Sequence, residues 1–298
     1  MPTARERVFA AWGADTPTPV ERDPAWAPDG KRLAFAADLG DGFDLYVATE
    51  GGVPRRLTIA PGDERHPSWT PDGRIVFAMR AGDQWGLMLI NVDGSATDLP
   101  AVEVFVDTPA DERHPAVSPD GTRVAYVSSL EDERGADDIW VRPLPGVSLL
   151  PDGSDTSSGV RVGDDRPWRV TATQGRETYP SWDPTGARLA YATYADGAGA
   201  VWVAPVPSAD ALAERRSSRL SADGAILVSR FRAQPAWSPD GRILLLADLP
   251  AEWPAYNGNP LRVPGEPPAL FERGHPFTLR TIPAPLPPDA GIVRRVKG

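Results

Sequence analysis

Short apolar runs recur along the chain, and each is introduced by a turn. The turn reads Pro-Asp-Gly in four copies and Pro-Thr-Gly in one; proline fixes φ there, and glycine lets the chain leave a tight turn. The run after each turn alternates or is wholly apolar and β-rich, which predicts a strand. The five copies are DPAWAPDGKRLAFAAD from Asp23, HPSWTPDGRIVFAMR from His66, HPAVSPDGTRVAYVSS from His114, YPSWDPTGARLAYATY from Tyr179 and QPAWSPDGRILLLAD from Gln234.

More strands are expected within each copy. The first four copies continue, about ten residues later, into the apolar runs DLYVA, LMLIN, DIWVR and AVWVA. A closing strand ends in RLT at Arg56–Thr58 and in RVT at Arg169–Thr171, and more loosely in RLS at Arg219–Ser221. Four short antiparallel strands in each unit of this length are typical of a propeller blade. The pattern therefore predicts an all-β chain that forms one β-propeller domain over residues 1–298.

The number of blades depends on the C-terminal region. His275-Pro276 repeats the start of a unit but lacks the tryptophan and the Pro-Asp-Gly turn. We interpret Phe277–Ile282 as the inner strand of an incomplete sixth blade, whose outer strand would come from Glu6–Trp12 at the N-terminus. Closing the ring in this way would remove an open sheet edge. Six blades are predicted; the alternative is five blades followed by a C-terminal segment that forms no blade of its own.

Three segments lie outside the repeat. Pro143–Arg166 is rich in Pro, Gly, Ser and Asp, which predicts a mobile loop. Ala209–Arg216 has the composition of one or two helical turns, and Leu249–Glu272 is proline-rich and irregular.

Composition narrows the class of partner and the compartment. The 298 residues carry a formal charge of −10, which argues against nucleic acid, since binding it needs a concentrated basic face. The chain has no cysteine, so disulfides and thiolate metal sites are excluded. It has no apolar stretch long enough to span a membrane, and its N-terminus does not read as a signal peptide. The expectation is a cytoplasmic protein, with an exported protein whose leader has been removed as the alternative.

The repeat itself resembles a known family. The motif P-[SA]-W-x-P-D-G, followed by an apolar strand and D-[LI]-[YW]-V, resembles TolB-like, WD-related propeller repeats over residues from about 20 to 250. Such blades occur in the periplasmic protein TolB, in the propeller of prolyl-oligopeptidase-type peptidases and in oligogalacturonate lyases. The chain as given has no G-x-S-x-G motif, so a complete peptidase of that type is not expected.

Residues at one repeat position should form a ring about the propeller axis. The position before the repeat proline holds all three histidines of the chain; its residues are Asp23, His66, His114, Tyr179, Gln234 and His275. Two residues earlier lie Glu21, Glu64, Glu112, Glu177, Arg232 and Arg273. Because side chains two apart on an extended strand share a face, we expect both rings to line one mouth of the central channel. Four recurring tryptophans are instead assigned to packing between blades: Trp26, Trp69, Trp182 and Trp237.

This predicted mouth favours binding of a protein partner or a small anionic ligand. The candidate ligand-binding residues are Asp23, His66, His114, Tyr179, Gln234, His275, Glu64, Glu112, Arg232 and Arg273. Arginine can hold a carboxylate through two parallel hydrogen bonds. A purely structural interpretation stays open, in which the histidines bond to neighbouring blades and the charges form a solvated rim.

Whether the protein is an enzyme is left open by the sequence. His66, His114, His275 and Gln234 form a nitrogen and oxygen set suited to a divalent cation such as Mn, Zn or Ca. The resemblance to oligogalacturonate lyases, which hold Mn²⁺ with histidines and a glutamine, implies a lyase or hydrolase acting on a carboxylate-bearing substrate. It also implies that Arg232 or Arg273 anchors the carboxylate, and that a neutral arginine or a glutamate acts as the base.

Overall fold

The computed structural model describes twelve parts of the chain, which hold four copies of the repeat and most of the fifth. These are residues 12, 19–92, 99–130, 136–144, 167–173, 175–195, 198–206, 225–229, 233–237, 241, 243–248 and 279–283. The three segments predicted outside the repeat lie almost wholly outside the described residues. No described residues form a helix of the length and apolarity needed to cross a membrane.

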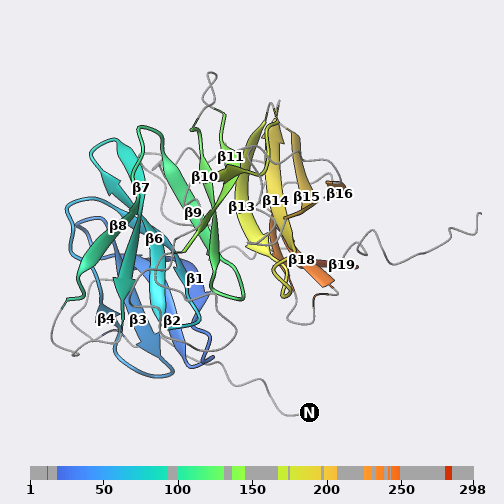
Figure 1. The fold of residues 1–298 in the computed structure, drawn as a ribbon. Helices are drawn as coiled ribbons and strands as arrows, with labels where there is room; N and C mark the ends of the chain where they lie inside the picture. The colour runs from blue at the N-terminus through green and yellow to red at the C-terminus, as the bar shows by residue number, and fades with distance from the viewer. Residues whose placement is uncertain are drawn as a thin grey trace, which may run out of the picture.

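The described residues form five antiparallel sheets (Figure 1). The first contains β1 (Val20–Trp26), β2 (Arg32–Asp38), β3 (Phe43–Thr49) and β4 (Arg55–Arg56). The second contains β5 (Glu64–Trp69), β6 (Arg74–Ala81), β7 (Gln84–Asn91) and β8 (Val102–Val106). The third contains β9 (Glu112–Val117), β10 (Arg123–Ser128), β11 (Asp138–Pro143) and β12 (Trp168–Arg169). The fourth contains β13 (Arg176–Trp182), β14 (Arg188–Ala195), β15 (Ala198–Pro205) and β16 (Ile226–Ser229), and the fifth contains β17 (Ala233–Trp237), β18 (Ile243–Asp248) and β19 (Leu279–Pro283).

The sheets are arranged as propeller blades. Each sheet begins with its innermost strand, and the inner strands β1, β5, β9, β13 and β17 contact one another in that order. The strands lie where the apolar patterns place them, and the three Pro-Asp-Gly turns among the described residues join the first two strands of their blades. The all-β propeller class predicted from the repeat is therefore confirmed.

The C-terminal strand differs from the prediction. Leu279–Pro283 pairs with β18 as the third strand of the fifth sheet, with Leu245 opposite Thr281, and is not the inner strand of a sixth blade. Of the expected outer strand at Glu6–Trp12 only Trp12 is described; its ring packs against Phe35 and Tyr46 of the first sheet. The residues that would decide between five and six blades lie outside the described ranges.

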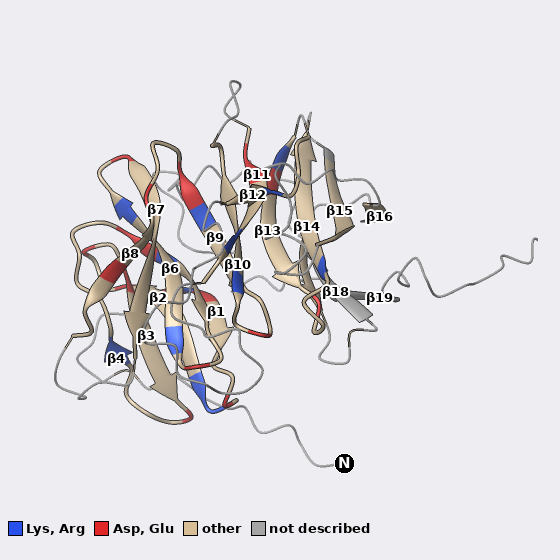
Figure 2. Cartoon of the chain, in the orientation of Figure 1, with Lys and Arg blue, Asp and Glu red and all other residues tan. Residues whose placement is uncertain are grey.

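The core lies between neighbouring blades. Apolar side chains from facing sheets are buried together, for example Leu45 of the first sheet with Ile75 and Phe77 of the second. Further clusters of this kind join the second sheet to the third and the third to the fourth. Charged residues lie mostly at strand ends and in connections (Figure 2). Blade-to-blade packing therefore supplies most of the buried apolar surface.

Tryptophans connect successive blades as predicted, with one exception. Trp69 and Trp182 are buried, and each indole N–H donates to an inner-strand carbonyl of the preceding blade, Ala25 and Ala116 respectively. Trp237 is partly buried and donates to Ser181 in the same way. Trp26 is 54% exposed, so the prediction that it is buried between blades is wrong. Trp69, Trp182 and Trp237 each contact the blade that precedes theirs in the sequence. No described blade precedes the first one in the sequence, so among the described residues Trp26 has no such surface to pack on.

Candidate functional site

Four residues before the repeat prolines share an unusual backbone conformation. Asp23, His66, His114 and Tyr179 have φ angles of 54°, 55°, 51° and 53°. A positive φ is uncommon outside glycine, and a following proline also disfavours right-handed helical backbone. In each of the four blades that hold these residues the register between the first two strands shifts at or beside this point, which marks a β-bulge. Bulges re-aim side chains, so a bulge that occurs in four blades is a designed feature of the inner strands.

The bulges bring the four side chains together. The rings of His66 and His114 have centroids 3.9 Å apart with an interplanar angle of 39°. The rings of His114 and Tyr179 follow at 4.6 Å, edge to face. On the other side, His66 Nε2 lies 3.8 Å from Asp23 Oδ2. Side chains from four successive blades thus form one continuous row, which we call the inner row.

Burial makes both imidazoles of the inner row neutral at physiological pH. It lowers the pKa of His66 to about 4, although Asp23 acts in the opposite direction. Burial, together with His66 and Arg113, holds the pKa of His114 well below its usual value. A neutral imidazole carries one N–H donor and one acceptor nitrogen. The His66 side chain is only 10% exposed, and its Nδ1 has no hydrogen-bond partner among the described residues.

Each histidine of the inner row is preceded in the sequence by an arginine, Arg65 or Arg113, which lies close enough to affect its pKa. Neither arginine was among the predicted site residues. Arg65 Nε donates to Asp23 Oδ2 at 2.6 Å, and its guanidinium lies 4.5 Å from the centroid of the Phe43 ring. Burial alone would raise the pKa of Asp23. The charge of Arg65, and that of His66 in its protonated form at low pH, lower the pKa of Asp23 to about 2. Arg113 lies 3.4 Å from Asp111 and 3.7 Å from Asp137. The sequence feature that could have identified them is the arginine directly before the histidine in both copies of DERHP.

The glutamates two positions earlier do not line the mouth, which corrects the sequence prediction. Glu64, Glu112 and Glu177 are fully buried, because the bulge breaks the two-residue alternation on which the prediction rested. Glu64 accepts a hydrogen bond from Thr58 Oγ1 at 2.9 Å, and Glu177 accepts one from Thr171 Oγ1 at 2.9 Å. Burial raises the pKa of Glu64 and Glu177 to about 8 and that of Glu112 to about 7. Glu21 is exposed and accepts from the Trp12 indole at 2.7 Å.

Each of two buried glutamates adjoins an ion pair from the preceding blade. Asp44 pairs with Arg56 at 2.5 Å, and Asp138 pairs with Arg169 at 2.5 Å. The aspartates begin the recurring motifs DLYV and DIWV, and the arginines begin the recurring motifs RLT and RVT. The recurrence of both motifs in the same blades could have predicted these ion pairs. The networks join strands within and between blades and are structural.

The remaining candidate residues are not brought into the row by the described structure. Gln234 is exposed on β17, while Arg232, Arg273 and His275 lie outside the described residues. Within the described ranges, no three His, Cys, Asp or Glu side chains are grouped so as to hold a metal ion. Two imidazoles bound to one tetrahedral ion would have ring centroids about 5 Å apart, given zinc–nitrogen distances of about 2.0–2.1 Å. The rings of His66 and His114 are tilted by 39° with centroids 3.9 Å apart, which is closer than in such a site.

Known proteins match this chain over parts of its length. Residues 6–141 match the family model of the lipoprotein LpqB β-propeller domain. Tricorn protease homolog 1 of Streptomyces coelicolor is 30% identical over 171 residues, which cover 54% of this chain and 13% of that protein. The chain spans 6% and 13% of the lengths of two curated relatives, so the activities of those whole proteins do not transfer to it.

Solved structures of TolB share the fold. TolB from Acinetobacter baumannii superposes with a TM-score of 0.56 at 14% identity, covering 78% of this chain and 49% of that one. The putative TolB from Agrobacterium tumefaciens gives 0.54 at 16% identity, covering 79% and 72%. The chain therefore has the β-propeller fold of TolB.

Proposed function

We propose that this propeller is an interaction module that engages a partner protein, or a small anionic ligand, at the inner row. The observation that carries the proposal is the convergence of Asp23, His66, His114 and Tyr179 from four successive blades. Each of the four keeps a left-handed backbone, which costs about 1–3 kcal/mol per residue. Strain of this kind concentrates at ligand clamps, so its fourfold retention on one face supports a binding role there.

The chemistry of the row indicates what it would bind. Neutral imidazoles can donate to a carboxylate or a backbone carbonyl and accept from an N–H, while Tyr179 adds an aromatic edge. Arg65 and Arg113 are paired with aspartates, so their positive charges are largely compensated and add little net charge to the row. A peptide segment with a carboxylate or carbonyl group fits these features. An anchoring role for Arg232 or Arg273 stays part of the proposal.

Photo-crosslinking tests this proposal. Tyr179 is replaced by p-benzoyl-phenylalanine in the native host, and Val53, which is 76% exposed, is replaced in the same way as a matched surface control. Irradiation should give one discrete adduct from position 179 that mass spectrometry can identify, and none of that mass from position 53. Equal adducts from both positions, or none from position 179, would contradict an interaction site at the row.

The metal-dependent lyase or hydrolase remains the alternative: two of the three histidines are adjacent in the row, and binding an ion would require their rings to move apart. Under it, wild-type protein should bind about one equivalent of Mn²⁺, Zn²⁺ or Ca²⁺ in calorimetric titration. The variants His66→Ala and His114→Ala should lose that binding while their circular dichroism stays that of a β-propeller. A wild-type protein that binds none of the three ions would remove this alternative.

The compartment in which the protein works is also a proposal. The similarity to a lipoprotein domain and to TolB supports export of this chain over a cytoplasmic location. Fractionation of the native host, with an antibody against this chain, would check it; recovery only with the soluble cytoplasmic fraction would contradict export.

A further inference from the structure

The outermost strand of the second blade differs from those of the first and third. Strands β4 and β12 are two residues long and end in Arg56 and Arg169, and short charged edges of this kind discourage pairing with other chains. Strand β8 is five residues long and reads VEVFV. In that sequence Val102 is 44% exposed and Val104 is 68% exposed. Among the described strands, none pairs with the outer side of β8.

The strand register shows which residues of the second blade occupy the positions of the arginine and aspartate in the first and third blades. Arg56 lies opposite Tyr46 and Arg169 opposite Trp140, and each arginine pairs with an aspartate two residues before that partner. In the second blade the residue opposite Met88 is Val104, and two residues before Met88 stands Gly86. Both members of the ion pair are therefore absent from the second blade. Its edge is apolar where the outer strands of the first and third blades carry arginine. The edge of β16 in the fourth blade is apolar as well, and one carbonyl of β8, that of Phe105, accepts from Arg142 of the third blade.

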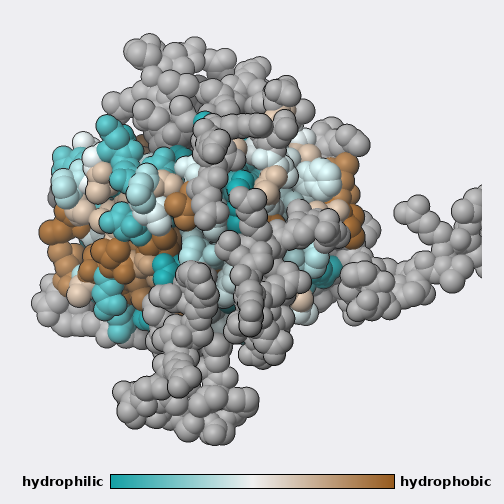
Figure 3. Space-filling model, turned by 45° about the horizontal axis from the view of Figure 1, so that its top comes forward, coloured by the Kyte–Doolittle hydropathy of each residue, from teal (hydrophilic) through white to brown (hydrophobic). Residues whose placement is uncertain are grey.

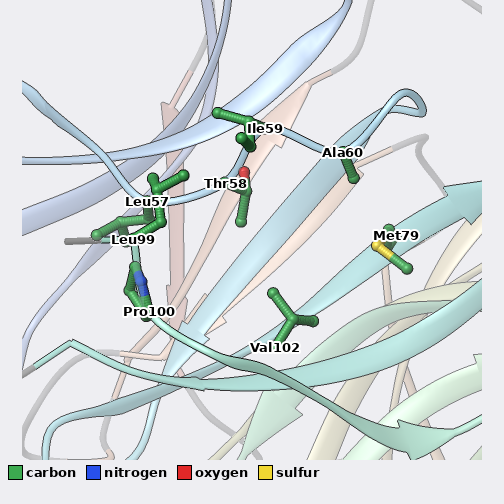
Figure 4. Close-up of a pocket in the computed structure, with 8 residues that line it drawn as sticks. All are labelled: Leu57, Thr58, Ile59, Ala60, Met79, Leu99, Pro100 and Val102. Atoms are coloured by element: carbon green, nitrogen blue, oxygen red, sulfur yellow. The ribbon is translucent and has the colours of Figure 1, made fainter.

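An apolar pocket lies beside this edge, between the first and second blades. It has a volume of about 270 Å³. In Figure 4 the segment Leu57–Ala60 faces Leu99–Val102 across the pocket, with Met79 at one end. Ile59 is 59% exposed and Leu99 is 45% exposed, so its rim is apolar as well. Figure 3 shows apolar side chains gathered on the side of the molecule where these two blades lie.

The dimensions and charges define the occupant. The pocket is smaller than the roughly 300–1,000 Å³ that hold small organic ligands, and suits single side chains of a polypeptide. An open strand edge can take up an extended peptide as an added strand, with alternate side chains entering adjacent pockets. Glu103 and Asp107 are exposed along the same edge, and the whole chain carries a charge of −10. We propose that β8 and this pocket bind an extended segment of a partner protein in which apolar residues alternate with basic ones.

The site is distinct from the inner row, because β8 is the outermost strand of its blade and the row lies on the innermost strands. A fluorescein-labelled peptide of alternating Lys and Val serves as the probe, with fluorescence anisotropy as the readout. One control peptide alternates Glu and Val, and another carries Pro at its centre and so cannot form the full ladder. Val104→Lys and Val102→Lys test the site. Ile226→Lys, at a 43% exposed position on the outermost strand of the fourth blade, is the matched control.

Wild type and Ile226→Lys should bind the Lys/Val peptide with the same affinity. Each β8 variant should bind it at least tenfold more weakly, and both control peptides should bind at least tenfold more weakly to wild type. Unchanged binding by both β8 variants, or equal binding of the Glu/Val peptide, would overturn the proposal. A dimer in sedimentation velocity that Val104→Lys abolishes would overturn it in favour of a second copy of this chain as the occupant.

Discussion

The phrase Asp-Glu-Arg-His-Pro occurs at 63–67 and again at 111–115, and its two copies have both shared and different environments. Asp63 Oδ1 accepts the backbone N–H of Phe43 at 3.1 Å, and Asp111 Oδ1 accepts that of Trp85 at 3.0 Å. Both aspartates thus bind the start of the third strand in the preceding blade. Both glutamates are fully buried, and both histidines adopt a left-handed backbone and stack in the inner row. These features follow from the repeated phrase itself.

The surroundings make the copies different. Glu64 adjoins the Asp44–Arg56 pair, whereas Glu112 accepts from Thr108 and from Ser128, without such a pair beside it. Two residues after the phrase, Trp69 closes the first copy and Val117 the second. The same five residues therefore give the same local backbone, while the energetic weight of each copy depends on the blade in front of it. Pairs of matched substitutions can separate these two contributions.

The largest expected difference is between Trp69 and Val117, which occupy the same repeat position. Trp69 is 7% exposed, donates to Ala25 and lies under the guanidinium of Arg32 at 4.9 Å. Trp69→Ala should lower the free energy of unfolding by about 3–5 kcal/mol, since it empties a large buried volume. Val117 is only partly buried, so Val117→Ala should cost about 1 kcal/mol. Urea denaturation measures both, and equal losses would show that the indole does not fix the first pair of blades.

The buried glutamates should respond differently to pH. Their raised pKa values mean that the folded state binds a proton more tightly than the unfolded state, so their contribution to stability is complete below about pH 4.5 and is lost as pH rises. For Glu64 the loss extends to about pH 8, and for Glu112 to about pH 7. Glu64→Gln should remove on the order of 3 kcal/mol of the loss in stability between pH 5 and pH 8, and Glu112→Gln on the order of 2 kcal/mol.

Urea titrations of wild type and both variants at pH 5 and pH 8 check this. The isosteric amide keeps the hydrogen bonds from the threonines and cannot ionise, so the comparison isolates the proton. If the stability of wild type is the same at both pH values, or if both variants flatten its pH dependence equally, the assigned difference between the two copies is wrong.

The sequence was sufficient for the fold because its signals are local and repeated. Pro-Asp-Gly turns and alternating apolar runs specify strands whatever surrounds them, and five copies in one order leave a propeller as the consistent arrangement. The expectation failed where it relied on one copy alone. Leu279–Pro283 follows a motif without the turn, and its pairing with β18 is decided by tertiary contact across the 30 residues that separate the two strands.

At the candidate site, the sequence predicted that residues before the repeat prolines lie close together, and the rings of His66, His114 and Tyr179 do so. The orientation predicted for the glutamates two positions earlier was wrong. The direction of Glu64 and Glu112 could not be predicted from two-residue alternation, because the left-handed backbone at each histidine breaks the alternation between the histidine and the residues before it. Residue preference alone does not predict that conformation: aspartate and histidine adopt it more often than most residues do, but it stays uncommon for them as well.

The smallest expected effect concerns this backbone. His66 and His114 have φ angles of 55° and 51°, so a β-carbon at either position costs the same local strain. Alanine removes the imidazole but keeps the strain, whereas glycine removes both, since it tolerates left-handed backbone without a steric penalty. Against this, glycine carries more entropy in the unfolded chain, which offsets part of the gain. The glycine variant should therefore be more stable than the alanine variant by about 1 kcal/mol at both positions, as measured by urea denaturation. A glycine variant less stable than alanine at either copy would mean that the bulge relaxes once the ring is gone, and that ring stacking, not the repeated phrase, sets the backbone there.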